Sequence, residues 1–152
     1  MDKSYDTIED LLVNLFNDIM RIEEKAIITQ DFKDITNNDM HIIDAIGIDE
    51  AKNMSTIAKS LGVTVGTLTI AINALVKKGY THRIRSEVDR RVVLISLTEK
   101  GKKAYAHHKA FHKDMVDATV EGLLEEEKVL LTESLSRLVT FFRDYEKREK
   151  KK

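Results

Sequence analysis

The sequence of 152 residues contains no cysteine and no proline. The absence of cysteine excludes disulfides, thiolate metal ligands, cysteine nucleophiles and thiol-based redox sensing. Because proline breaks helices and glycine weakens them, a chain with no proline and only six glycines can form long uninterrupted helices. We therefore expect a mainly α-helical protein that forms a single domain over residues 1–152, since domains of ~100 to 150 residues are the commonest.

Long apolar runs are also missing, because no stretch approaches the ~20 apolar residues that a membrane span needs. Hydrophobic residues make up 42% of the chain and charged residues 34%, a balance typical of soluble globular proteins. The first six residues are acidic and polar, and they lack the basic start and apolar run of a signal peptide. These features predict a cytoplasmic protein without a membrane partner.

Positive charge is scarce at the start of the chain and abundant in its middle. Between residues 2 and 50 there are thirteen acidic and four basic side chains, whereas between residues 77 and 109 there are ten basic and three acidic ones. The net charge of −1 conceals this asymmetry. A basic segment can bind a polyanion or can be a solvated helix face, and its position in the fold must decide between the two.

Apolar residues recur at steps of three and four near both ends of the chain, which predicts amphipathic helices. We expect long helices at residues 5–28 and between residues 98 and 147, where Thr98 can cap one helix and the acids from Glu125 suit the start of another. A single small domain does not require such long helices. We therefore expect their apolar stripes to pack across a two-fold axis into a homodimer.

The segment between these helices carries the signals of a helix-turn-helix. The polar residues 36–39 can cap a short helix that ends near Gly47, a third helix opens at Ser55 and ends at Gly62, and Thr64 can cap a fourth that stops at Gly79. Two helices around such a tight turn are the arrangement in which the first helix braces the second against the DNA major groove.

The hydrophobic period then changes to that of β-strands. Residues 80–85 and 91–97 are rich in β-branched and aromatic side chains and flank the polar turn 86–90, which predicts a β-hairpin. A helix-turn-helix followed by a hairpin is a winged helix-turn-helix, here at about residues 37–97. The predicted fold class is thus mainly α with a small β-hairpin wing, dimeric through its N- and C-terminal helices.

One face of the fourth helix and the tip of the hairpin are expected to contact double-stranded DNA. Hydroxyl, amide and apolar side chains of the helix suit phosphates, adenine and thymine methyl groups, and the hairpin arginines can enter a minor groove. An aspartate at the tip can hold an arginine in place. Since the helix face carries no lysine or arginine before Lys77, we expect a palindromic, A/T-rich operator. The expected contact residues are Thr64, Val65, Gly66, Thr67, Ile70, Asn73, Arg85, Asp89, Arg90 and Arg91.

Three motifs resemble the MarR family of winged-helix repressors. They are the runs Gly79–Arg83, Asp89–Arg91 and Leu97–Gly101. The resemblance spans nearly the whole chain, and it implies an obligate dimer that is built through its first and last helices.

Within this family, the sequence is most similar to the repressors of fatty-acid synthesis in Gram-positive bacteria. The stretches that carry this similarity are residues 32–35, 40–47, 63–69, 83–93 and 111–116. The resemblance implies a long-chain acyl group on acyl carrier protein as a corepressor. Apolar residues near the dimer helices could line the acyl tunnel, since ligand pockets are mostly apolar, although such residues also form ordinary cores. These residues are Phe16, Met20, Ile43, Phe111 and Met115.

Some features of the sequence point to other functions. His108 and His112 lie four residues apart, a spacing that suits zinc, and His41 could approach them, but no carboxylates cluster beside them in the sequence. We expect structural histidines, no metal and no bound cofactor. The sequence lacks the motifs of hydrolases, nucleotide-binding enzymes and metalloproteases, so we expect no enzyme. A repressor released by a small aromatic ligand or responding to zinc, and a winged-helix module that binds protein instead of DNA, remain open.

Overall fold

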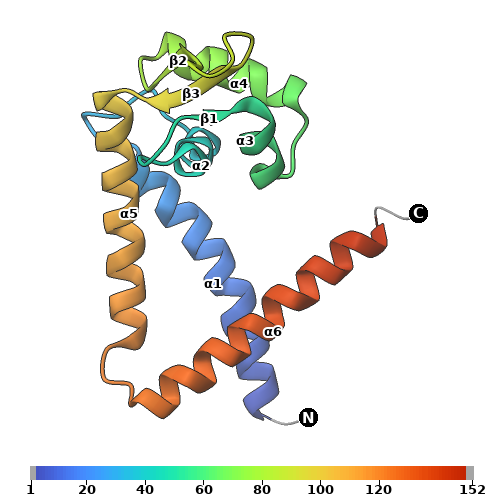
Figure 1. The fold of residues 1–152 in the computed structure, drawn as a ribbon. Helices are drawn as coiled ribbons and strands as arrows, with labels where there is room; N and C mark the ends of the chain where they lie inside the picture. The colour runs from blue at the N-terminus through green and yellow to red at the C-terminus, as the bar shows by residue number, and fades with distance from the viewer. Residues whose placement is uncertain (1–2, 150–152) are drawn as a thin grey trace. The chain divides into compact units, whose positions relative to one another are not determined.

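The structure is a computed structural model that describes residues 3–149. Its elements are α1 (Lys3–Ile27), α2 (Asn37–Ile46), β1 (Lys52–Asn53), α3 (Met54–Leu61), α4 (Val65–Lys77), β2 (Thr81–Arg85), β3 (Val93–Leu97), α5 (Glu99–Val120) and α6 (Glu125–Glu149) (Figure 1). The chain divides into two compact units, Met1–Phe111 and His112–Lys152. The predicted class, mainly helical with a small β-hairpin, is confirmed. Residues 1–2 and 150–152 of the predicted domain lie outside the described residues.

Side-chain caps define where the short helices begin. The Thr36 hydroxyl accepts from the Asp39 amide at 3.1 Å, and the Asp39 carboxylate accepts from the Thr36 amide at 3.0 Å, so α2 opens with the capping box that the polar cluster predicted. The prediction that Ser55 opens α3 is wrong by two residues. Asn53 caps this helix instead, because its extended backbone lets its side chain accept from the Thr56 amide at 2.8 Å.

The strands form an antiparallel sheet in the order β1-β3-β2. β2 and β3 pair from Thr81 opposite Leu97 to Arg85 opposite Val93, which confirms the predicted hairpin. β1 was not predicted, since two residues are too short to show alternation. Its pairing with β3 places Asn53 opposite Leu94 and thereby ties the start of α3 to the sheet.

The core of the first unit lies between α2, α3, α4 and the sheet. On α4, the predicted inner residues Leu68, Ile72 and Leu75 are all at most 1% exposed. Other core residues are Ile27, Phe32, Ile35, Met40, Ile43, Ile46, Ile57, Tyr80, Ile95, Leu97 and Ala104. Because one side of α4 is fixed in this core, the opposite side is held rigidly at the surface.

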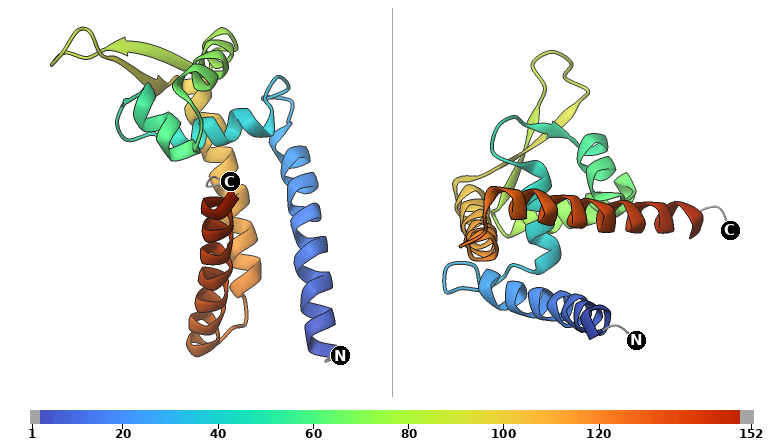
Figure 2. Two further views of the ribbon diagram at one scale, coloured as in Figure 1. Left: turned by 90° about the vertical axis from the view of Figure 1, so that its right-hand side faces the viewer. Right: turned by 90° about the horizontal axis from the view of Figure 1, so that it is seen from below.

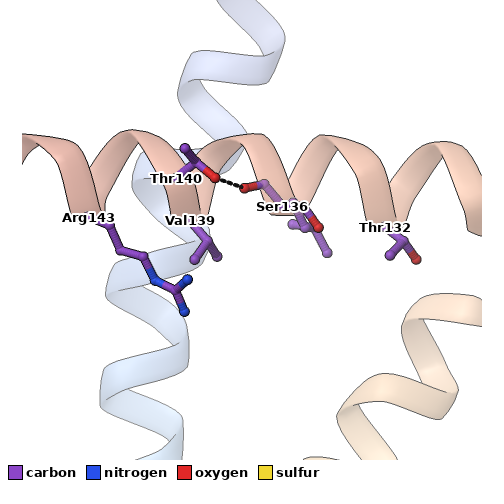
Figure 3. A pocket seen from close by; sticks show the side chains of 6 residues that line it. Thr132, Ser136, Val139, Thr140 and Arg143 are labelled. Atoms are coloured by element: carbon purple, nitrogen blue, oxygen red, sulfur yellow. Dashed lines mark hydrogen bonds between the residues drawn. The ribbon is translucent and has the colours of Figure 1, made fainter.

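The predicted long helix at the N-terminus is confirmed, and among the described residues most of its apolar stripe is exposed. Ile8, Leu11, Leu15 and Phe16 are each more than half exposed. Among its described residues, α6 has no buried residue at all. One side of α6 borders a depression of about 420 Å³ lined by Thr132, Leu135, Ser136, Val139, Thr140 and Arg143 (Figure 3). Both helices therefore carry several exposed apolar side chains.

Within residues 3–149, no single helix is long and apolar enough to cross a membrane. Only α3 and α4 together reach the required length and composition, as a pair bent by 106°.

Candidate nucleic-acid interface

The bend between α3 and α4 presents α4 at the surface. Gly62 ends α3 with φ 68° and ψ 27°, in the left-handed region that glycine adopts without strain, and its amide donates to the carbonyls of Ala58 and Lys59. The bend of 106° lies within the range of about 90–120° found in helix-turn-helix motifs. The short turn thus separates a supporting helix from an exposed one.

The six residues that the sequence predicted as DNA contacts here, the N-cap Thr64 and five residues of α4, are all exposed. At the N-terminus, the Thr64 hydroxyl accepts from the Thr67 amide at 3.2 Å and donates to the Thr67 hydroxyl at 3.0 Å. Ile70 is 74% exposed, which is unusual for an isoleucine in a packed helix. The remaining exposed residues are Val65, Gly66 and Asn73. This side is uncharged, apolar and hydroxyl-rich, and the helix N-terminus adds a partial positive charge.

The hairpin forms the second part of the candidate interface. Its loop extends away from α2, α3 and α4 (Figure 2). Ser86 and Asp89 order the loop: the Ser86 amide donates to the Val92 carbonyl at 3.0 Å, and the Asp89 carboxylate accepts from the Arg91 amide at 3.0 Å. The Asp89 carboxylate also lies 3.8 Å from the Arg91 guanidinium, so the expected pairing of this aspartate with an arginine is present. Arg85 and Arg90 line a depression at the hairpin loop.

Two features of this surface were missed in the sequence. Val88 is 99% exposed at the tip of the loop, where an apolar side chain has no partner in the fold. Arg83 crosses from β2 to α4, and its guanidinium donates to the Asn73 side-chain oxygen. The alternation of strand residues could have revealed Arg83, since it shares a face of β2 with the predicted Arg85.

A polar cluster around the buried Tyr80 side chain anchors the base of the hairpin. The Tyr80 ring is completely buried, and its hydroxyl donates to the Asp34 carboxylate at 2.7 Å. The Lys100 ammonium lies 4.1 Å from the centroid of the Tyr80 ring and 3.6 Å from the Asp34 carboxylate. Burial, followed by the bond to Asp34, raises the pKa of Tyr80. The hydrogen bond from Tyr80 is the main cause that lowers the pKa of Asp34.

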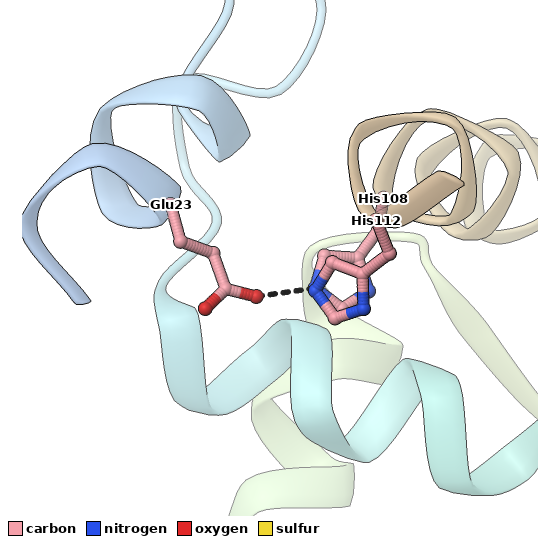
Figure 4. A group of neighbouring side chains, drawn as sticks. All are labelled: Glu23, His108 and His112. Atoms are coloured by element: carbon pink, nitrogen blue, oxygen red, sulfur yellow. Dashed lines mark hydrogen bonds and ion pairs between the residues drawn. The ribbon is translucent and has the colours of Figure 1, made fainter. Parts of the chain in front are cut away.

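The first unit also contains a buried pair of a carboxylate and an imidazole, which the sequence did not predict. Glu23 of α1 and His108 of α5 are 5% and 1% exposed, and their Oε1 and Nε2 atoms lie 2.8 Å apart (Figure 4). The His41 ring stands edge-on to the His108 ring, with centroids 6.4 Å apart. The pair joins helices that are 85 residues apart in the chain, so no local pattern could reveal it. Imidazole and carboxylate groups are also zinc ligands.

The residues predicted to line a ligand tunnel occupy different environments. Ile43 is fully buried in the core, whereas Phe16 and Met20 are 51% and 56% exposed on α1. Phe111 is partly buried at the end of the first unit, and Met115 is 36% exposed in the second unit. A different depression of about 250 Å³ lies between α2, the α3–α4 turn and α4, and its lining contains none of the five residues.

Comparison with known proteins assigns the chain to a family. The MarR family model matches residues 35–93, from the start of α2 to the start of β3. The structure of Streptococcus pneumoniae FabT in complex with DNA is similar at a TM-score of 0.82 and 42% identity, covering 92% of this chain and 98% of that chain. The HTH-type transcriptional regulator SarZ of Staphylococcus haemolyticus is 32% identical over 114 residues, which are 74% of this chain and 75% of SarZ.

The uncharacterized HTH-type transcriptional regulator YhjH of Bacillus subtilis is 28% identical over 109 residues, 70% of this chain, and the match spans 62% of that protein's length. The resemblance found in the sequence is thus confirmed by its relatives and by its fold. The chain belongs to the MarR family and is a winged-helix transcriptional regulator rather than an enzyme.

Proposed function

We propose that this regulator is a dimeric, sequence-specific DNA-binding repressor of fatty-acid synthesis genes, and that long-chain acyl-acyl carrier protein is its corepressor. The observation that carries the proposal is the similarity to FabT in complex with DNA, at 42% identity over 98% of that chain. The proposed site of action is the cytoplasm.

In this proposal, α4 enters the major groove with its exposed side. Gly66 permits close approach of the backbone, Ile70 contacts a thymine methyl group, and the hydroxyls of Thr64 and Thr67 bind phosphates or base edges. The tip arginines Arg85, Arg90 and Arg91 enter the adjacent minor groove. Asp89 acts indirectly, because it preorganises Arg91.

The uncovered apolar sides of α1 and α6 support dimerisation. Exposed apolar side chains that recur along one helix are typical of a protein interface. A two-fold dimer would present two copies of α4 to half-sites about one helical turn apart, and the operator would then be palindromic. Of the five residues predicted to line an acyl tunnel, Phe16 and Met20 are half exposed on α1, and we propose that the acyl chain lies against these two side chains.

The test is a titration of fluorescently labelled promoter DNA from fatty-acid synthesis genes, read by anisotropy. Long-chain acyl-acyl carrier protein is expected to strengthen binding, and acyl carrier protein without an acyl chain is the control. Unchanged affinity with the acylated carrier, together with a large change on adding a phenolic acid, would overturn the acyl corepressor. An absence of any DNA complex at low salt would instead indicate a protein-binding module, because phosphate contacts strengthen as salt falls.

A divalent metal ion is a second candidate effector, and the buried Glu23–His108 pair favours it, because carboxylate and imidazole groups are zinc ligands. The same titration with zinc in place of the acylated carrier tests this alternative. The variant His108→Ala should abolish a zinc response while leaving an acyl response in place.

A further inference from the structure

Arg83 and Asn73 form a contact between the two parts of the interface. The Arg83 Nη2 atom donates to Asn73 Oδ1, and both side chains are exposed. Asn73 lies on α4 and Arg83 on β2, so the bond joins the helix to the base of the hairpin.

The strand register explains why Arg83 reaches α4. Arg83 pairs with the buried Ile95, and the buried Thr81 pairs with the buried Leu97. Side chains two residues apart share a face, so Thr81, Arg83 and Arg85 follow one line along β2. This line begins in the core beside α4 and ends near the tip, and Arg83 occupies its middle.

The bond changes the hydrogen-bonding character of α4. The exposed side of α4 carries no cation before Lys77. Arg83 supplies a guanidinium with five N–H donors, one of which is used in the bond to Asn73. Asn73 Oδ1 accepts this bond, so the Asn73 side chain can offer its two N–H groups as donors. The pair therefore presents donors, whereas recognition of adenine by asparagine also needs the oxygen as an acceptor.

We propose that Arg83 and Asn73 act as one donor-rich unit that binds hydrogen-bond acceptors of the operator beside α4, and that Arg83 is a specificity-determining residue. The inference rests on the proposed DNA binding. Acceptors of this kind are guanine N7 and O6 in the major groove and the phosphate oxygens next to it. If Arg83 and Asn73 bind in this way, each half-site of an otherwise A/T-rich operator contains at least one G·C pair or one defined phosphate contact.

The experiment is a double-mutant cycle on an operator selected from random DNA with the wild-type protein. Arg83→Ala and Asn73→Ala are each expected to weaken binding about tenfold or more, since a good bidentate base contact discriminates by this much. The double variant should bind about as well as the weaker single variant, because both substitutions remove the same unit. His82→Ala is the control, since His82 lies on the opposite face of β2 and contacts Ser96.

Modified operators distinguish the two acceptors. Replacement of a guanine by 7-deazaguanine removes N7, and a methylphosphonate removes one phosphate charge. One of these should weaken wild-type binding and have no effect on Arg83→Ala. Arg83→Lys keeps the charge but not the planar fork, and it should retain salt-dependent affinity while losing preference for the selected sequence.

Several results would overturn the inference. Wild-type affinity in Arg83→Ala, or losses in the two single variants that add fully in the double variant, would show that the residues act separately. Thermal melting of every variant identifies one that fails to fold, and Arg83→Lys then carries the test alone. If the wild-type protein selects no sequence at all, the proposed DNA binding fails rather than the Arg83–Asn73 unit.

Discussion

Gly101 shows how a single residue holds the hairpin against α5. A Cβ atom at this position would lie 2.0 Å from the Tyr80 carbonyl oxygen, which belongs to the backbone and cannot rotate away. The Gly101 amide donates to the Thr98 hydroxyl at 3.1 Å, as the predicted cap of α5 requires. The close approach allows the Thr98 amide to donate to the Tyr80 carbonyl at 3.0 Å.

Gly101→Ala should therefore destabilise the fold by about 1–3 kcal/mol, the usual range for overpacking. For a chain of this size, each kcal/mol lowers the melting temperature by about 2–4 °C, and thermal denaturation measures it. Gly66→Ala is the control, because its Cβ would meet only the Thr64 hydroxyl at 3.9 Å. This control should keep or raise the melting temperature, since alanine favours helix. Equal melting temperatures for the two variants would contradict the close approach.

Tyr80 links stability to pH. Its pKa is raised above the ordinary 10.0, chiefly by burial and then by the bond to Asp34. The folded protein thus holds this proton more tightly than the unfolded chain. The resulting stability is complete below pH 10.0 and decreases as the pH rises toward the higher pKa of the folded state.

Tyr80→Phe should remove about 1 kcal/mol of stability at neutral pH through the lost hydrogen bond. It should also flatten the loss of stability above pH 10, and urea denaturation at increasing pH measures both effects. Tyr5→Phe, at a side chain that is 69% exposed, is the control. The account would be wrong if Tyr80→Phe and the wild type lost stability with the same slope in alkali.

At the scale of elements, the sequence predicts what local chemistry decides. Thr36, Thr64 and Thr98 were identified as caps because a short hydroxyl side chain reaches the amides of the first helical turn. β1 and the Asn53 cap depend on pairing with β3, some forty residues later in the chain. The contacts from Arg83 to Asn73 and from Glu23 to His108 likewise depend on tertiary packing, and local periodicity carries no signal for them.

The hairpin gives a prediction about a whole element. Arg91→Ala should abolish most operator binding, because the Arg91 side chain is 94% exposed on the tip and makes few contacts within the fold. For the same reason its melting temperature should not change. Anisotropy titrations at several salt concentrations should show a shallower salt dependence, since a phosphate or minor-groove cation is lost.

Arg21→Ala removes the same charge from α1 and should bind the operator normally. Retained operator affinity in Arg91→Ala would exclude the tip as a principal contact.

For the molecule as a whole, the long terminal helices are the main site of exposed apolar side chains among the described residues. The sequence predicted these helices and their apolar stripes, and we propose that a second copy of the chain covers them. The amphipathic pattern of these helices therefore indicates the interface of the proposed dimer rather than packing within one protomer.

Leu15→Glu should convert the proposed dimer to a monomer and lower operator affinity at least tenfold. Leu15 is 54% exposed near the middle of the α1 stripe, and the two-fold axis would place two new charges in an apolar interface. Light scattering after size-exclusion chromatography measures the mass. Asn17→Glu places the same charge on the other side of α1 and should remain dimeric. A dimeric Leu15→Glu variant would rule out the α1 stripe as interface.

The proposed targets of this MarR-family regulator are the control regions of fatty-acid synthesis genes. Recovery and sequencing of the DNA bound to the protein across its own genome tests this proposal. We expect fragments upstream of fatty-acid synthesis genes that share a palindromic, largely A/T-rich site with half-sites about one helical turn apart. Enrichment of a shared site upstream of unrelated genes, or no enrichment over a strain that lacks the protein, would contradict it.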